Sequence, residues 1–192
     1  MPIPRQREHT GRMRAPRVVP PLAALVIVVT TTASAPAVPP AERTLEDPVE
    51  PGKAFDIVSV RIAAAPAPGR KATIAVQHDR RVDVGDAIDV WVDTDADWVP
   101  DLFVTGASFS EYAVYRARSW TSHGREITDQ GCASLKMDRR RSVVRVDPSC
   151  LAPSTRFSVS VRSYVLDEPA RTDDYVPGKH RFSPRVLSYL PD

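Results

Sequence analysis

Apolar and polar residues alternate along most of the chain after residue 55. The apolar positions of the clearest stretches are Val58, Val60 and Ile62; Ile74 and Val76; and Ile88, Val90 and Val92. Because successive side chains of a β-strand point to opposite faces, this period of two predicts strands with one buried and one polar face. Asp89 and Trp91 are then expected on the face opposite Ile88.

The remaining apolar stretches are also short and β-branched. Further strands are expected at 102–105, 112–117, 143–146, 157–165 and 186–190. Turn-forming residues separate them, as in "APAPGR" and "VPGK", and no stretch of ten residues has the apolar period of a helix. The pattern predicts an all-β chain, an antiparallel β-sandwich of about seven to nine strands, with a small barrel as the alternative.

The first part of the chain has a different pattern. Five arginines and one glutamate precede the apolar run "LAALVIVV" at 22–29, which is the order of a secretory signal peptide. Eight apolar residues are far fewer than the roughly 20 that span a bilayer. We expect a signal peptide over 1–37, cleaved after Ala37 because the competing site at 33–35 would leave Pro36 next to the cut; an uncleaved, loosely anchored segment is the alternative. The prediction is a secreted protein with no membrane contact after cleavage.

Residues 36–52 contain five prolines and five charged side chains without apolar periodicity. Such composition predicts a disordered, Pro-rich linker over 38–53, followed by a β-sandwich domain over 54–192. The chain has 26 Lys and Arg against 24 Asp and Glu, but five of the bases and one of the acids precede residue 38, so the remainder carries a net charge of −2. A weakly acidic domain argues against nucleic acid as a partner.

The chain has two cysteines, Cys132 and Cys150, which in an exported protein predict one disulfide. Closing a loop of this length stabilises the fold by about 3 kcal/mol in the chain-entropy model. Two buried free thiols are the alternative. Trp120, twelve positions before Cys132, is expected to pack against the bridge.

The segment "VDTDADWVPDLFV" concentrates acidic residues. The candidate metal ligands are the side chains of Asp93, Asp95, Asp97 and Asp101 and the carbonyl of Val99. This spacing matches positions 1, 3, 5, 9 and 7 of an EF-hand-type loop, and Ca²⁺ prefers six to eight such oxygens. These nine residues alone resemble the "DxDxDGxxD" calcium loops of integrin-type propeller blades and thrombospondin repeats.

Two departures weaken this calcium prediction. Trp98 occupies position 6, where these loops use Gly with positive φ, and Val104 replaces the bidentate Glu of position 12. Both predict weak affinity, with a dissociation constant of about 10⁻⁴ to 10⁻³ M. The alternative is a solvated hairpin whose aspartates cap their own backbone. Eight acidic residues and no basic residue lie between Arg81 and Arg116. In a metal-free hairpin these acids repel one another unless a basic segment elsewhere in the chain compensates their charge.

Other candidate residues point to binding rather than to catalysis. Trp98, inside the acidic loop, is expected to be exposed as a platform for a ligand, and a residue folded down over the sheet is the alternative. The basic turn around 139–141 is expected to be a solvated charge run or a site for a polyanion or cell-wall polymer. His78, His123 and His180 show no zinc-like spacing, and no nucleophile or phosphate-loop motif is present. We therefore predict a protein that is not an enzyme.

Four segments together carry a resemblance that spans most of 55–190. They are "DVWVDTDADWVPDLFV" at 89–104, "GCASL" at 131–135, "DPSCLAPSTRFSVSV" at 147–161 and "DDYVPGKHRFSPRV" at 173–186. The combination resembles uncharacterised small secreted two-cysteine proteins of high-GC Gram-positive bacteria. The resemblance implies export, a β-sandwich and a metal-compatible loop, but no particular activity. This chain departs from the pattern at Ala96, Trp98 and Ala152.

The sequence favours a secreted, non-enzymatic β-sandwich module that binds Ca²⁺ weakly in the acidic loop. The first alternative is a metal-free interaction or inhibitor domain that binds a protein or a cell-wall polymer. The second is a secreted hydrolase whose catalytic residues are scattered along the chain.

Overall fold

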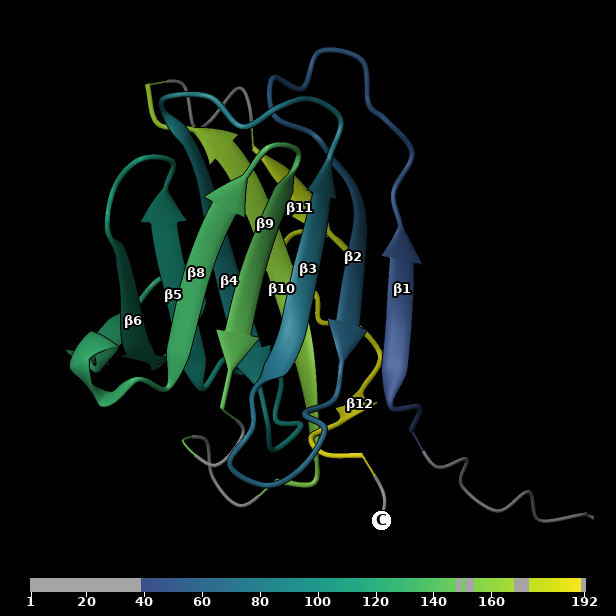
Figure 1. Cartoon of the computed structure of the whole chain (residues 1–192), viewed down its shortest axis with the longest axis vertical. Helices are drawn as coiled ribbons and strands as arrows, with labels where there is room; N and C mark the ends of the chain where they lie inside the picture. The colour runs from purple at the N-terminus through teal and green to yellow at the C-terminus, as the bar shows by residue number, and fades with distance from the viewer. Residues whose placement is uncertain (1–38, 148–149, 151–153, 168–172, 191–192) are drawn as a thin grey trace, which may run out of the picture. The chain divides into compact units, whose positions relative to one another are not determined.

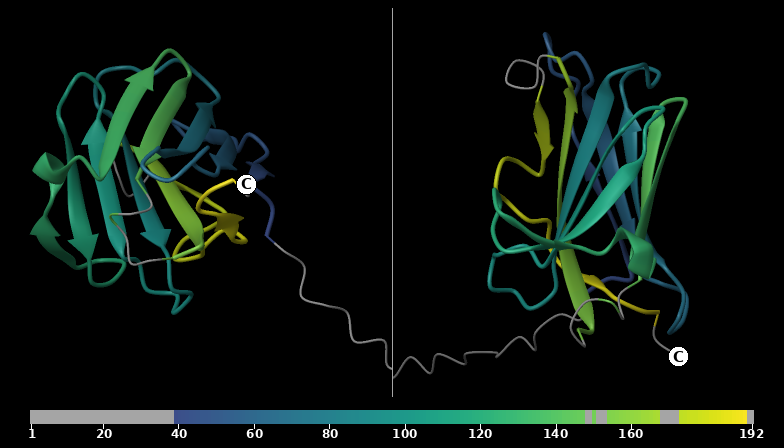
Figure 2. Two further views of the ribbon diagram at one scale, coloured as in Figure 1. Left: turned by 60° about the horizontal axis from the view of Figure 1, so that its bottom comes forward. Right: turned by 90° about the vertical axis from the view of Figure 1, so that its left-hand side faces the viewer.

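The computed structural model describes residues 39–147, 150, 154–167 and 173–190. Within them the chain forms two antiparallel β-sheets packed face to face, with one short 3₁₀ turn, η1 (Thr128–Gln130) (Figure 1). Figure 2 shows the two layers from the side in its right-hand view. The all-β class and the β-sandwich are thus confirmed. The expected signal peptide, residues 1–37, lies outside the described residues, as does Ala152.

The smaller sheet has five strands in the order β1-β2-β3-β9-β8. These strands are β1 (Glu42–Glu46), β2 (Ile57–Ala63), β3 (Ala72–His78), β9 (Arg141–Val146) and β8 (Ala133–Asp138). Two hairpins, β2-β3 and β8-β9, therefore lie side by side through the pairing of β3 with β9.

The larger sheet has seven strands, six of them in the order β11-β10-β4-β5-β6-β7, with β12 paired to β10. They are β11 (Asp174–Val176), β10 (Arg156–Val165), β4 (Asp86–Asp93), β5 (Leu102–Ala107), β6 (Tyr112–Ala117), β7 (His123–Glu126) and β12 (Val186–Leu187). Strands β4 to β7 form a meander, and β10 returns from the smaller sheet to pair along the whole of β4.

The core lies between the two sheets, where the predicted alternation places it. Ile88, Val90 and Val92 of β4 are fully buried in this core. Strand β2 departs from the prediction, because Ile57 is fully buried while Val58 is only half-buried. A register shift between positions 57 and 59 causes this change, since a β-bulge turns the preceding side chains to the other face.

The predicted disulfide joins Cys132 and Cys150, whose Cα atoms are 5.5 Å apart. Cys132 follows η1 and belongs to the core, and Cys150 packs against that core after β9. Backbone hydrogen bonds from the N–H of Asp147 to the carbonyl of Cys132 and from the N–H of Cys150 to the carbonyl of Asp147 close the same turn. The bridge therefore ties the two ends of the β8-β9 hairpin together.

The expected disordered linker over 38–53 is wrong for the part that forms β1. This strand pairs with β2 from Glu42 opposite Ala63 to Glu46 opposite Ser59. Leu45 packs against the core, and Arg61 donates hydrogen bonds of 2.6 and 2.7 Å to Glu42. The apolar pattern does not indicate this edge strand, because backbone hydrogen bonds to β2 and one apolar side chain hold it in place. The β-sandwich therefore begins before residue 54.

The described residues contain twelve strands, more than the seven to nine expected. The strands not foreseen are β1, β7, β8 and β11. All four lie at sheet edges, and β1, β7 and β8 have several exposed positions, so their apolar periodicity is weak. In the described parts of the chain, no helix has the length and apolarity needed to cross a membrane.

Candidate functional site

The acidic loop, residues 93–101, connects β4 to β5. The backbone N–H of Asp101 closes the loop by donating a hydrogen bond of 2.8 Å to the carbonyl of Val92. One carboxylate oxygen from each of Asp93, Asp95 and Asp101 lies within 4.8 Å of the others. Asp97 is not part of this group. Three of the four predicted side-chain ligands are therefore brought together, and calcium binding by the loop stays a prediction.

The aspartates of the acidic loop also cap their own backbone. Asp93 Oδ1 accepts hydrogen bonds of 3.1 and 2.8 Å from the N–H groups of Asp95 and Ala96. Asp97 Oδ1 accepts one of 2.7 Å from the N–H of Val99. These are the bonds expected of the metal-free hairpin, and the Val99 N–H takes part in them. The sharp turns needed for this capping place Ala96 and Trp98 at φ of 72° and 67°.

Trp98 is 67% exposed, as expected for a ligand platform. Its positive φ is the conformation that position 6 of a calcium loop requires, although a bulky side chain is disfavoured there. The sequence thus identified both the exposure and the strained position correctly. Its role as a platform stays a prediction.

Arginines from other segments compensate the buried acids of β4. Hydrogen-bonded or close pairs join Arg80 to Asp86, Arg162 to Asp89, and Arg185 to Asp93. Burial raises the pKa of Asp93, whereas the N–H of Ala96 and the positive charge of Arg185, 3.5 Å away, lower it. The chain therefore supplies part of the positive charge that the acidic region needs, which weakens the case for calcium at Asp93.

The outer face of the larger sheet carries a second, aromatic cluster. The ring centroids of Trp91 and Phe103 are 5.2 Å apart, and Trp120 lies 5.8 Å from Trp91 and 4.6 Å from Phe182. Trp120 thus packs on this outer face and not against the disulfide, which is buried between the sheets. The prediction for Trp120 is wrong because the β6-β7 hairpin carries residues 118–122 to the outside of the sheet.

A concavity of about 430 Å³ opens on this cluster, and we call it the aromatic depression. Its lining residues are Trp91, Trp120, Thr121, Arg162, Asp173, Tyr175, Lys179 and His180. His180 stacks on Trp120 with centroids 5.1 Å apart, and Arg162 and Lys179 lie 5.7 and 5.8 Å from the Tyr175 ring. Aromatic faces therefore alternate with charged groups around the depression.

Trp91 is the most deeply buried residue of this lining, at 6% exposure. Its indole Nε1 is buried and has no hydrogen-bond partner within the described structure, and the same is true of Arg162 Nε. Buried donors are nearly always paired in proteins, so these two nitrogens are exceptions, and both belong to residues that line the depression. The sequence pattern placed Trp91 on the face opposite Ile88 but could not indicate its unpaired nitrogen.

The basic turn identified in the sequence joins β8 to β9 and borders a wider concavity of about 530 Å³, the basic depression. Its lining is Gln77, Arg81, Lys136, Asp138, Arg139, Arg140, Arg141 and Val143. Among the described residues, none of the buried unpaired polar atoms belongs to this lining, and none of the lining residues is aromatic. Most of its lining side chains are exposed, and binding of a polyanion by the basic turn stays a prediction.

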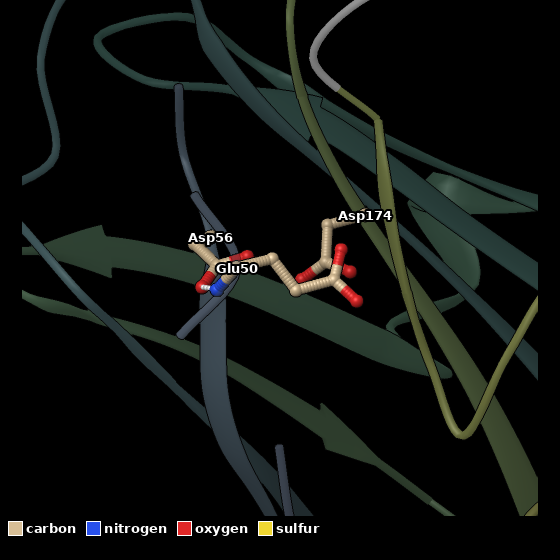
Figure 3. A group of neighbouring side chains, drawn as sticks. All are labelled: Glu50, Asp56 and Asp174. Atoms are coloured by element: carbon tan, nitrogen blue, oxygen red, sulfur yellow. Dashed lines mark hydrogen bonds between the residues drawn. The ribbon is translucent and has the colours of Figure 1, made fainter. Parts of the chain in front are cut away.

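A third group of acids was missed by sequence reasoning. Carboxylate oxygens of Glu50, Asp56 and Asp174 lie within 4.8 Å of one another, and we call them the three-carboxylate group (Figure 3). Glu50 is exposed, whereas Asp56 and Asp174 are 0% and 4% exposed. Asp174 is more than one hundred positions from the other two, so no local spacing could have indicated the group.

The histidines pack against aromatic rings. His78 stacks on Phe55 with centroids 3.9 Å apart, and His123 stacks on Phe103 at 4.1 Å. Neither the acidic loop nor the three-carboxylate group, the potential metal sites within the described part of the chain, includes a histidine. These contacts give the histidines packing roles.

Comparison of the chain with protein-family models and with curated proteins found no match to either.

Proposed function

We propose that this protein is a secreted, non-enzymatic binding module whose aromatic depression holds a sugar unit of a cell-wall polymer. The observation that carries the proposal is a concavity in which the rings of Trp91, Trp120 and Tyr175 alternate with the charged side chains of Arg162, Asp173 and Lys179. A volume of about 430 Å³ lies within the range of small-molecule sites, about 300–1,000 Å³.

The chemistry of the lining suits a sugar ring. A pyranose has one face of C–H groups, which packs on aromatic rings, and hydroxyls around its edge, which need donors and acceptors. The charged side chains of Arg162 and Lys179 would donate to these hydroxyls, and the carboxylate of Asp173 would accept from them.

Export is supported by two features that are independent of the depression. The arginine-rich start followed by "LAALVIVV" has the order of a signal peptide. The Cys132–Cys150 bridge is typical of proteins that fold in an oxidising compartment. In such a location a cell-wall polymer is accessible to the module.

Weak calcium binding by the acidic loop is a second part of the proposal. The convergence of Asp93, Asp95 and Asp101 supports it, and the proximity of Arg185 to Asp93 opposes it. The ion would fix the loop and would take no part in the aromatic depression.

The test is co-sedimentation of the purified protein with insoluble cell-wall fragments. Trp120→Ala removes one wall of the depression, and Trp98→Ala, an exposed tryptophan of the acidic loop, is the matched control. We expect Trp120→Ala to weaken binding about tenfold or more, equivalent to about 1.4 kcal/mol, and Trp98→Ala to bind as the unchanged protein does. Equal binding by all three proteins would reject the depression as the site. Loss of binding in Arg140→Ala alone would place it in the basic depression.

A further inference from the structure

The three-carboxylate group joins two parts of the chain that the sheet pairing does not connect directly. Glu50 and Asp56 belong to the connection between β1 and β2, and Asp174 is the first residue of β11. Figure 3 shows the Glu50 and Asp174 carboxylates side by side, with that of Asp56 facing them. A ligand at this point would therefore link the smaller sheet to the edge of the larger one.

Backbone donors satisfy only part of the group. Asp56 Oδ2 accepts a hydrogen bond of 2.8 Å from the N–H of Glu50, and Asp174 Oδ2 accepts one of 2.8 Å from the N–H of Ile57. Asp56 Oδ1 is buried, and no hydrogen-bond partner for it exists within the described structure. An unpaired oxygen on a fully buried carboxylate that faces two further carboxylates is the position where a bound cation would lie.

Within the described parts of the chain, one positive charge lies near the three-carboxylate group. Lys53 Nζ is 3.7 Å from Glu50 Oε2, and it donates a hydrogen bond of 2.5 Å to the carbonyl of Asp173. A single ammonium does not balance three carboxylates, and a fourth, that of Asp47, is close enough to be affected by their charges. Among the residues that the structure describes, the local excess of negative charge is at least two.

The pKa of a neighbouring carboxyl, that of Asp47, agrees with this excess of negative charge. Burial, followed by the charges of Asp174, Asp56 and Glu50, raises the pKa of Asp47 to about 6. A bound cation or a bound proton would each relieve the repulsion.

We infer that Glu50, Asp56 and Asp174 bind a divalent cation, and that this cation is Ca²⁺. The ligands are all carboxylate oxygens, which favours a hard ion over zinc or copper. They come from a surface connection and a short strand, and such an adaptable set suits the flexible coordination of Ca²⁺ better than the strict octahedron of Mg²⁺. The ion would hold the β1-β2 connection against β11.

The test is thermal unfolding of the full chain in millimolar Ca²⁺ and again in excess chelator. At free Ca²⁺ of about ten times the dissociation constant, the midpoint should rise by about 3–6 °C. Glu50→Gln, at an exposed position, should remove most of the rise without disturbing the fold. The matched control is Asp95→Asn, which removes only the smaller contribution of weak binding in the acidic loop and should keep most of the rise.

A second variant, Asp174→Asn, should change the melting midpoint in different directions with and without Ca²⁺. In chelator Asp174→Asn should leave the midpoint unchanged or raise it, because it removes a repelling charge and keeps an acceptor for the Ile57 N–H. In Ca²⁺ the same variant should melt below the unchanged protein. The inference is overturned if Ca²⁺ does not move the midpoint, if Glu50→Gln keeps the rise, or if Asp95→Asn loses it, which would place the ion in the acidic loop. None of these outcomes depends on carbohydrate binding.

Discussion

The guanidinium of Arg80 donates two hydrogen bonds of 2.7 Å to the two carboxylate oxygens of Asp86, whose side chain is 1% exposed. Asp86 Oδ2 also accepts a 2.6 Å bond from the N–H of Asp83. The pair fixes the start of β4, the strand that carries Trp91 on one face and the core valines on the other.

Removing this arginine should be costly. Arg80→Leu leaves a buried carboxylate without its cation, and we expect the free energy of unfolding to fall by about 3 kcal/mol, near the lower end for buried pairs because Arg80 is 36% exposed. Arg61→Leu, which breaks the exposed pair with Glu42, is the matched control and should cost far less. Urea denaturation at pH 7 measures both. Equal costs would contradict the structural role of the Arg80 pair.

His78 should make stability depend on pH. Burial, together with the charge of Arg80, lowers its pKa from 6.5 to about 3. Between these values the unfolded chain binds a proton that the folded chain does not, so stability rises with pH and is lost as pH falls from about 6.5 towards 3. The carboxyl of Asp47, with its pKa raised to about 6, acts in the opposite direction in part of this range.

A non-titrating variant isolates the histidine. Relative to His78→Gln, the unchanged protein should lose about 1.4 kcal/mol per pH unit, or about 3 kcal/mol between pH 6.5 and 4. Chemical denaturation at several pH values gives the difference directly. A difference between the two proteins that does not change with pH would show that His78 titrates normally in the folded state.

Trp98→Gly should stabilise the protein. The residue has a φ of 67° and a side chain that is 67% exposed, so the change removes a disfavoured conformation and little packing. We expect a gain of about 0.5–1 kcal/mol in the free energy of unfolding. Val99→Gly, at a neighbouring position without positive φ, is the control and should destabilise. If Trp98→Gly destabilises as much as the control, the indole makes contacts that its exposure does not indicate.

The sequence predicted the inner layers of the sandwich well, because apolar side chains at every second position decide which face of a strand is buried. Ile74, Val76 and the apolar positions of β4 lie in the core as expected. Edge strands such as β1 and β8 were not foreseen. They are held by backbone hydrogen bonds to a neighbouring strand, and their own apolar residues do not alternate clearly.

The candidate sites show the same difference. Contacts within one loop can be predicted from sequence spacing, whereas contacts between distant segments cannot. Asp93, Asp95 and Asp101 converge because a tight loop brings alternate residues together, which spacing alone can indicate. Asp174 meets Glu50 through pairing across the fold, and Trp120 meets Phe182 on an outer face that no local pattern defines. The arginine partner of Asp93, at position 185, was likewise beyond the reach of sequence spacing.

The central claim is that the aromatic depression binds a sugar unit, and the indole N–H groups report on it directly. The chain has three tryptophans, so a ¹⁵N-labelled sample should give three indole N–H signals, assigned by single Trp→Phe variants. On titration with soluble cell-wall glycan fragments, we predict that the signals of Trp91 and Trp120 shift in a saturable way, while that of Trp98 stays in place. Signals of Trp91 and Trp120 that do not move at saturating glycan would contradict the account.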